Sequence, residues 1–264
     1  MALITVCSAK GSPGATVTAL AFTLSWTRRV ILAECDPAGG DIAAGYLREI
    51  ALGGRNLGQL TASLARGRLA EDLWPQLVDL APDKTTAMTR LVLPGLIDPA
   101  QAAGVAPGWE QLAQLFRSLE SGDDGYHVIA DCGRLVTAYP PTAVLTAADA
   151  VLVVLRPTLP SIRSSAFALS ALARIGAGPV GLVTVGDGTY GTKEIAAELH
   201  APLVAALPDD PGTATVLSSG GERHRGRLLR AASRAEDEIW QLVTAGRARR
   251  TGRPSQGQEV RSVH

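Results

Sequence analysis

The chain has 264 residues, of which 46% are hydrophobic, and its formal net charge is zero at pH 7. This length allows one large α/β domain or two small ones with a substantial apolar core. The balanced charge excludes a global electrostatic attraction to nucleic acid or anionic lipid. The three cysteines match no disulfide framework, so we expect a reducing, cytoplasmic environment. We expect neither a membrane span, which needs about 20 apolar residues, nor a signal peptide.

The first third of the chain alternates predicted strands and helices. The apolar, β-branched run at 3–8 predicts a buried strand, and the helical spacing of apolar residues from Ala15 predicts a helix directly after it. A second buried strand is expected at 30–37. A stripe of leucines predicts that 56–80 is helical.

The remainder of the chain continues this alternation. Strands are expected at 90–95, 126–133, 149–157, 179–186 and 202–210, and helices at 109–120, 161–174, 192–200 and 227–245. The pattern predicts a three-layer α/β fold, in which helices flank a mostly parallel, twisted sheet of about seven strands. We expect one domain over residues 1–245. The Arg-rich segment 246–264 has no apolar periodicity and is expected to be disordered.

Polar turns follow four of the predicted strands. They lie at Lys10–Thr16, Asp36–Asp41, Asp131–Arg134 and Pro208–Asp210. Ligands of open α/β sheets bind beyond the carboxyl ends of the strands. We therefore expect the chemistry of this protein at these four turns.

The first turn, "KGSPGAT", resembles a phosphate-binding loop in part. The strict pattern G-x-x-x-x-G-K-[ST] fails at Ala9 and at Ala15, where the loop lysine would stand. Gly11 and Gly14 still permit backbone N–H groups to form an anion nest, and a helix would begin beside them. An ordinary strand–turn–helix corner without a ligand remains the alternative.

Two aspartates, Asp36 and Asp131, lie at the ends of predicted strands. Asp36 ends the second strand and could orient a water molecule or hold metal-bound water, with Asp41 as a nearby alternative. The Asp-Pro-x-Gly-Gly sequence could equally be a turn without chemistry. Asp131 follows an apolar run in the Walker B arrangement, which places a carboxylate for Mg²⁺.

These motifs, in this order, resemble the ParA/MinD family of deviant P-loop ATPases. The resemblance is carried by "KGSPGAT", "ECDPAG" and "DCG", and further on by "VLVVLRPTLPSIRSS" and "PLVAALPDD", and it extends over residues 2–245. It implies a switch that binds ATP and Mg²⁺, closes as a homodimer and acts on a partner protein or surface. Chromosome or plasmid partitioning, septum placement and positioning of a cellular machine are the implied processes, with weak ATP hydrolysis.

The resemblance also assigns roles to individual residues. Lys10 matches the signature lysine that reaches the partner subunit's phosphates, Thr16 matches the Mg²⁺ hydroxyl, and Asp36 and Asp131 match the water-positioning and Walker B acids. Asp36 is also a candidate for the metal site. The implied nucleotide contacts are Lys10, Gly11, Ser12, Pro13, Gly14, Ala15, Thr16, Val17 and, beside the adenine, Pro208 and Asp209.

Ala15 departs from the family pattern, because the absent lysine binds the β- and γ-phosphates there. Lys10, Arg134 or Arg156 could supply the missing charge, and Asp187 could replace the family's adenine-binding asparagine. The departure supports a second hypothesis, a catalytically inactive pseudo-ATPase that acts as a structural interaction protein. A metabolic ligase of the same class ranks last.

Two further features of the sequence are read more simply. Cys7, Cys35 and Cys132 lack ligand spacing and are interpreted as small buried thiols rather than a cluster site. The Arg-rich stretch 220–230 and the C-terminal segment could contact DNA phosphates, or could be a solvated helix face and tail.

Overall fold

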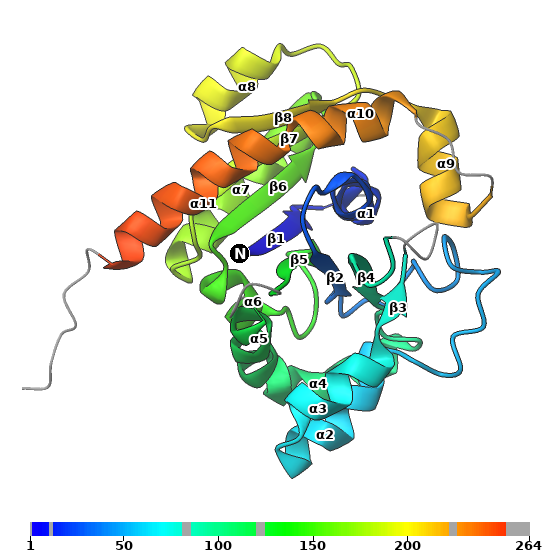
Figure 1. Ribbon diagram of the computed structural model, residues 1–264. Coiled ribbons are helices and arrows are strands. Elements are labelled where there is room, and N and C mark those ends of the chain that lie inside the picture. The colour runs from blue at the N-terminus through cyan, green and yellow to red at the C-terminus, as the bar shows by residue number, and fades with distance from the viewer. Residues whose placement is uncertain (1, 11–12, 81–85, 120–124, 222–225, 252–264) are drawn as a thin grey trace, which may run out of the picture.

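A parallel sheet forms the central layer of the computed structural model, which describes residues 2–10, 13–80, 86–119, 125–221 and 226–251 (Figure 1). The described strands are β1 (Leu3–Ser8), β2 (Val30–Glu34), β3 (Val78–Asp79), β4 (Arg90–Leu93), β5 (His127–Arg134), β6 (Ala150–Leu155), β7 (Val180–Val185) and β8 (Leu203–Leu207). They lie in the order β3-β4-β2-β5-β1-β6-β7-β8, and the β3–β4 pair alone is antiparallel.

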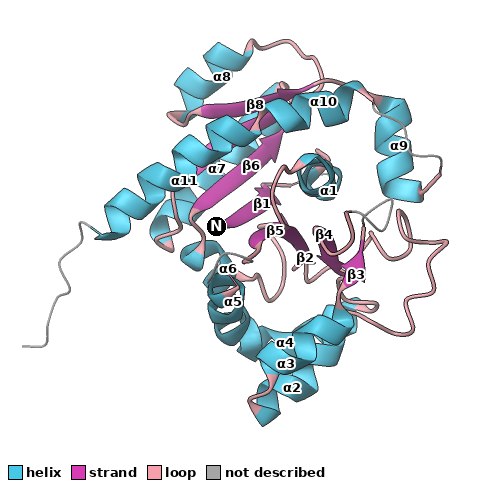
Figure 2. Cartoon of the chain, in the orientation of Figure 1, coloured by secondary structure: helices cyan, strands magenta, loops and turns pink. Residues whose placement is uncertain are grey.

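Helices cover both faces of the sheet, which confirms the predicted three-layer fold (Figure 2). On one face lie α2 (Leu60–Arg66), α3 (Leu69–Leu73), α4 (Ala102–Val105), α5 (Trp109–Ser118), α6 (Thr142–Ala147), α7 (Leu159–Arg174) and α8 (Thr192–Leu199). On the other lie α1 (Ala15–Ser25), α9 (Pro211–Ser219), α10 (Arg227–Arg234) and α11 (Glu236–Thr251). None of the described helices is long and apolar enough to cross a membrane.

The central strands are buried on both faces, as their continuous apolar runs predict. Successive side chains of a strand point to opposite faces, so Leu3 and Cys7 of β1 pack in one apolar cluster and Ile4 and Val6 in the other. All three cysteines are free and buried, which confirms the interpretation as small core thiols. This packing holds the carboxyl ends of β2, β5 and β1 side by side.

The predicted helical segment over 56–80 is confirmed for 57–66 and 69–76, but it is interrupted, and its end is a strand. Gly67 ends α2 in the left-handed region at φ 66°, and Pro75 lies in a 3₁₀ turn that follows α3. The chain then enters the two-residue strand β3, which pairs with β4 at the sheet edge. A leucine stripe alone does not reveal these interruptions, and a two-residue strand has no periodicity to detect.

The predicted helix over 227–245 is two helices. α10 ends at Arg234, and α11 begins at Glu236 and continues to Thr251. The expected boundary between residues 245 and 246 therefore falls inside a helix. The predicted disorder of 246–264 is therefore wrong for 246–251, which belong to α11, and its remainder, 252–264, lies outside the described residues.

His127 lies buried between the rings of Trp26 and Trp240, with centroid separations of 5.8 and 5.0 Å. Neither ring nitrogen has a hydrogen-bond partner among the described residues. Burial lowers the pKa of His127 to about 3, because a charged imidazolium would lose its hydration without gaining a partner.

This burial predicts a pH-dependent stability. Below the unfolded pKa of His127 the unfolded chain binds a proton that the folded chain does not, so stability is full above about pH 6.5 and falls as the pH drops toward 3. From about pH 7.5 to 4.5 the wild type should lose roughly 2–3 kcal/mol more than His127→Phe, which keeps the ring contacts. Urea unfolding at both pH values measures this difference, and an equal loss would contradict it.

Candidate functional site

A hollow of about 390 Å³ lies over the carboxyl ends of β1, β2 and β5. It brings together three of the four polar turns that the sequence singled out. Its lining residues are Ser8, Pro13, Gly14, Ala15, Thr16, Val17, Asp36, Ala38, Gly39, Asp41, Gly133 and Arg134. The parallel register causes this meeting, because Asp131 of β5 lies opposite Val6 of β1 on one side and Glu34 of β2 on the other.

The amino end of α1 borders the hollow. Gly14 precedes the helix at φ 98° and ψ 35°, a left-handed backbone conformation that residues other than glycine rarely adopt. No side chain caps the amino end of α1. The first amides of a helix lack intrahelical acceptors and carry its positive dipole end. The N–H groups of Ala15, Thr16 and Val17 are therefore available to an anion. Gly11 and Ser12, which were also predicted nucleotide contacts, lie outside the described residues.

Asp131 lies buried at the end of β5, below this helix end. Its carboxylate accepts a hydrogen bond from the Gly133 backbone N–H at 3.0 Å, and the nearby Thr16 side chain also lowers its pKa. Burial nevertheless raises the pKa of Asp131 to about 6, with nearby Asp36 and Asp41 adding to the effect. Thr16 and Asp131 thus place a hydroxyl and a carboxyl oxygen together, which is a donor set suited to Mg²⁺.

Asp36 forms an adjacent wall of the hollow. Its Oδ1 accepts a hydrogen bond from the Ala38 N–H at 2.8 Å, and burial raises its pKa while the positive charge of Arg134 opposes that rise. Its carboxylate lies against Gly133, where an added Cβ would approach Oδ2 to 1.8 Å. Gly133 therefore gives Asp36 its place beside Asp131.

Glu34 is a buried carboxylate that the sequence analysis did not single out. Its Oε1 accepts from the N–H groups of Asp41 and Ile42 at 2.9 and 3.0 Å, and its Oε2 accepts from Gly95 at 2.9 Å. Burial raises its pKa to about 7 despite these three donors. Glu34 shapes the turn after β2, and its place two residues before Asp36 was the only signal in the sequence.

Lys10 does not line this hollow. It borders a neighbouring one of about 350 Å³ together with Pro13, Arg156 and the first residues of α7. Lys10 therefore lines a different hollow from Thr16, although Pro13 borders both hollows.

Pro208 lies at a third hollow of about 490 Å³, beyond the ends of β7 and β8. Asp187 also lines it, and the neighbouring Asp209 accepts a hydrogen bond from Arg227 at its backbone oxygen. Arg227, Arg230 and Arg234 of α10 form the basic wall of this hollow.

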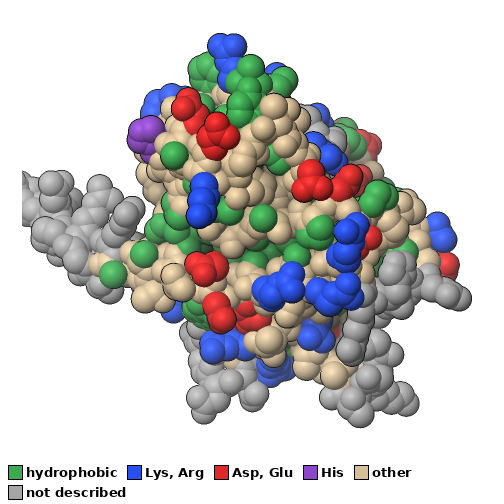
Figure 3. Space-filling model, turned by 90° about the horizontal axis from the view of Figure 1, so that it is seen from above, with side chains coloured by type: hydrophobic (Ala, Val, Ile, Leu, Met, Phe, Trp, Pro, Cys, Tyr) green, Lys and Arg blue, Asp and Glu red, His purple; other side chains and the backbone are tan. Residues whose placement is uncertain are grey.

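Basic and acidic side chains are interspersed on the face of the molecule seen from above (Figure 3).

Comparison with solved structures identifies the fold. No family profile and no curated sequence matches the chain. Among solved structures, the cell division ATPase MinD of Pyrococcus furiosus superposes with a TM-score of 0.70 at 18% identity, over 90% of this chain and 98% of that one. The chain has the MinD/ParA fold. The expectation of this P-loop ATPase fold is thereby confirmed.

Two further neighbours have ligands in their descriptions. The septum site-determining protein MinD of Pyrococcus horikoshii, complexed with Mg-ADP, has a TM-score of 0.69 at 17% identity, covering 92% of this chain and 97% of that one. A putative plasmid partition protein of Borrelia burgdorferi bound to AMPPNP has a TM-score of 0.68 at 12% identity, covering 90% and 98%. At these identities the likeness establishes the fold and leaves the roles of individual residues as proposals.

The contact between Gly133 and Asp36 yields a prediction. Gly133→Ala should destabilise the protein by about 1–2 kcal/mol more than Gly176→Ala, because both glycines have positive φ but only Gly133 has a close neighbour. Urea unfolding of the two variants isolates the close approach from the backbone strain. Equal losses would show that Asp36 is not held against Gly133.

Proposed function

We propose that this protein is a MinD/ParA-like switch that binds ATP with Mg²⁺ in the hollow over β1, β2 and β5. The supporting observation is that the uncapped amino end of α1, Thr16 and Asp36 line one hollow, and that the buried Asp131 lies beside Thr16 beneath it. A nucleoside triphosphate with its cation needs one group of donors for the phosphates and one group of oxygen ligands for the cation, and this hollow offers both.

The backbone of the turn would bind the phosphates. The N–H groups from Gly14 to Val17 would donate to phosphate oxygens at the positive end of α1. Thr16 and Asp131 would hold Mg²⁺, with Asp36 beside them, and the bound cation would offset the charge of the phosphates. Pro208, Asp209 and Asp187 are the proposed contacts of the base.

Arg134 is our candidate for the charge that Ala15 lacks. It ends β5, its side chain is exposed, and it is the one Lys or Arg among the described residues that line this hollow. A charge-assisted contact to phosphate is worth roughly 1.5–3 kcal/mol, so Arg134 could replace much of the lost lysine contact. Lys10, at the neighbouring hollow, is then free to reach the phosphates of a second copy.

Exposed apolar residues favour a face-to-face homodimer. Ile97, Val136 and Tyr139 follow β4 and β5 in the chain and are 70%, 83% and 52% exposed. Exposed apolar residues that lie beyond the ends of two strands of the site would suit a protein interface. We propose that the ATP-bound dimer binds a protein partner in partitioning, septum placement or positioning of a cellular machine. The neighbouring MinD of Aquifex aeolicus is described in a complex with MinC.

Ala15 supports a second candidate function. A pseudo-ATPase with the same fold would bind partners without turnover, because the loop lysine that stabilises developing charge is missing. Phosphate release measured with and without Asp36→Ala separates the two functions. A weak release that disappears in the variant supports the switch, and no release from either protein supports the pseudo-ATPase.

Isothermal titration with ATP–Mg²⁺ tests binding itself. We expect binding at sub-millimolar nucleotide. Asp131→Asn should weaken this binding about tenfold or more, because the variant lacks the carboxylate charge that would hold Mg²⁺. Asp237→Asn, at an exposed position in the first turn of α11, is the matched control and should bind as the wild type does. Absence of heat at millimolar nucleotide would contradict the proposed function.

Restoring the lysine tests how the turn is built. Ala15→Lys should raise ATP–Mg²⁺ affinity by about 10- to 100-fold, whereas Ala38→Lys, which adds the same charge at the exposed rim of this hollow, should gain much less. Unchanged affinity in Ala15→Lys would show that position 15 does not face the phosphates.

Removing the arginine tests the proposed replacement charge. Arg134→Ala should lower affinity about tenfold, while Arg156→Ala, at the neighbouring hollow, should have a smaller effect. A larger loss in Arg156→Ala would assign the replacement charge to that residue instead.

A further inference from the structure

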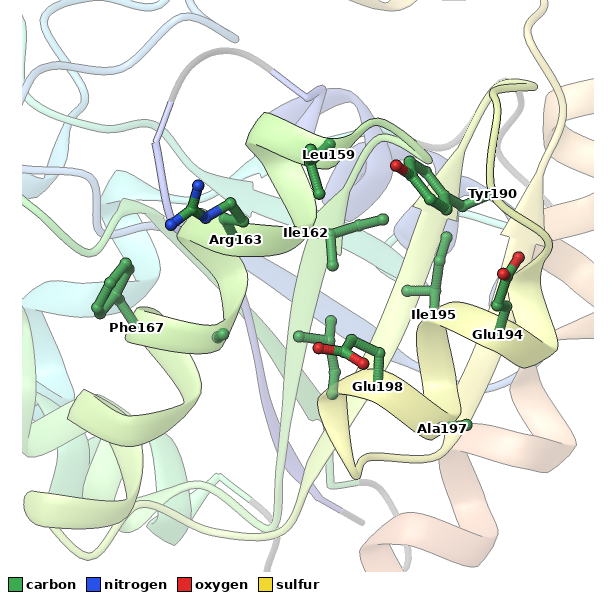
Figure 4. Close-up of a pocket in the computed structure, with 11 residues that line it drawn as sticks. Leu159, Ile162, Arg163, Phe167, Tyr190, Glu194, Ile195, Ala197 and Glu198 are labelled. Carbon is green, nitrogen blue, oxygen red and sulfur yellow. The ribbon is translucent and has the colours of Figure 1, made fainter.

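An apolar groove of about 650 Å³ separates α7 from α8, apart from the three hollows described above (Figure 4). Leu159 and Ile162 of α7 face Ile195 and Leu199 of α8, and Phe167 and Arg163 lie at the rim of the groove, on the side of α7 away from α8 in Figure 4. Ile162, Ile195 and Leu199 are buried and belong to the core cluster, so the floor of the groove is the outer surface of the core.

Helix α7 has a second set of apolar side chains, which no other described part of the chain covers fully. Ile162, Ser165, Ala168 and Leu172 form the buried face of the helix. Leu159 and Phe167, two turns apart, line the groove and remain 50% and 75% exposed. The other phenylalanines of the chain, at positions 22 and 116, are at most 1% exposed. The groove therefore exposes apolar area that is normally buried.

The two walls carry opposite charges. Glu194 and Glu198 lie one turn apart on α8, and Arg163 lies on α7. Glu194 caps its own helix by accepting from the Gly191 N–H, whereas Glu198 and Arg163 have no ion-pair partner within the described part of the chain. Glu198 extends from α8 into the space between the helices in Figure 4.

We propose that this groove binds an amphipathic helix of a partner protein, with basic residues on the flank that meets α8 and an acidic residue on the flank that meets Arg163. A groove between two helices accepts the side-chain ridge of a third, and apolar anchors at i, i+3, i+4 and i+7 fill such a groove. The opposed charges would fix the direction of the bound helix, because reversed flanks would place like charges together.

Helix α7 also lies between the groove and the hollow that contains Lys10. Pro160, Ser161 and Ser164 of this helix line the hollow that contains Lys10, while Leu159, Arg163 and Phe167 line the groove. A bound helix would therefore leave the phosphate-binding turn uncovered, and its binding requires no nucleotide.

Fluorescence anisotropy with the full-length protein and three labelled synthetic peptides of about 18 residues tests this proposal. The first peptide has a leucine stripe, arginines on one flank and glutamates on the other, and the second exchanges the two flanks. The third has the first peptide's composition in scrambled order. We expect the first peptide to bind about tenfold more tightly than either of the others. Glu198→Lys should reduce or reverse the preference between the first two.

Phe167→Ser tests the apolar anchor. It should weaken binding of the first peptide about tenfold, while Ile175→Ser, at the exposed C-terminal end of α7 and outside the groove, should leave it unchanged. Both positions are exposed, so neither variant should unfold, and circular dichroism verifies this.

Several results would overturn the proposal. Equal binding of the scrambled peptide would show non-specific apolar adhesion, and binding insensitive to Phe167→Ser would place the peptide elsewhere. No binding of the first peptide would likewise exclude the helix. If sedimentation finds a dimer that Phe167→Ser abolishes and Ile175→Ser retains, the occupant is a second copy of this chain.

Discussion

The proximity of the Thr16 side chain to the buried Asp131 carboxylate links the first helix to a strand in the middle of the sheet, and the site depends on this contact. Asp131 is almost fully buried, and burial raises its pKa to about 6 although the Gly133 N–H and the Thr16 side chain favour the charged form. A cation in the hollow would stabilise the carboxylate further. In the proposed function, this buried charge would be the partner of the metal cation.

The helix end above this carboxylate supplies the complementary charge. Gly14 turns the chain so that α1 begins at Ala15 without a side-chain cap, and its first N–H groups border the hollow. A side-chain ammonium would add one strong contact, but the amides and the helix dipole act whether or not residue 15 carries a charge. In our account, Ala15 in place of the loop lysine weakens phosphate binding, and Arg134 takes over part of the role that the lysine has in the family.

The sequence predicted the parallel strands well, because β1, β5 and β6 are continuous buried apolar runs that few other structures accommodate. It failed where tertiary contacts decide the structure. The strand β3 exists only through its pairing with β4, and the role of Glu34 depends on the Gly95 N–H, which is 61 residues away. The separation of Lys10 from the Thr16 hollow, and the exposure of Phe167, likewise depend on packing that no local pattern encodes.

The most direct test of the central claim observes the backbone amides themselves. In a ¹⁵N-labelled sample titrated with a non-hydrolysable ATP analogue and Mg²⁺, the account predicts saturable shifts of the Gly14, Ala15, Thr16 and Val17 amide resonances, and a shift of the Gly133 amide that reports on Asp131. If these resonances stay unchanged while the analogue is in excess, or if the shifts cluster around the hollow of Pro208 alone, the turn does not bind the phosphates and the account is wrong.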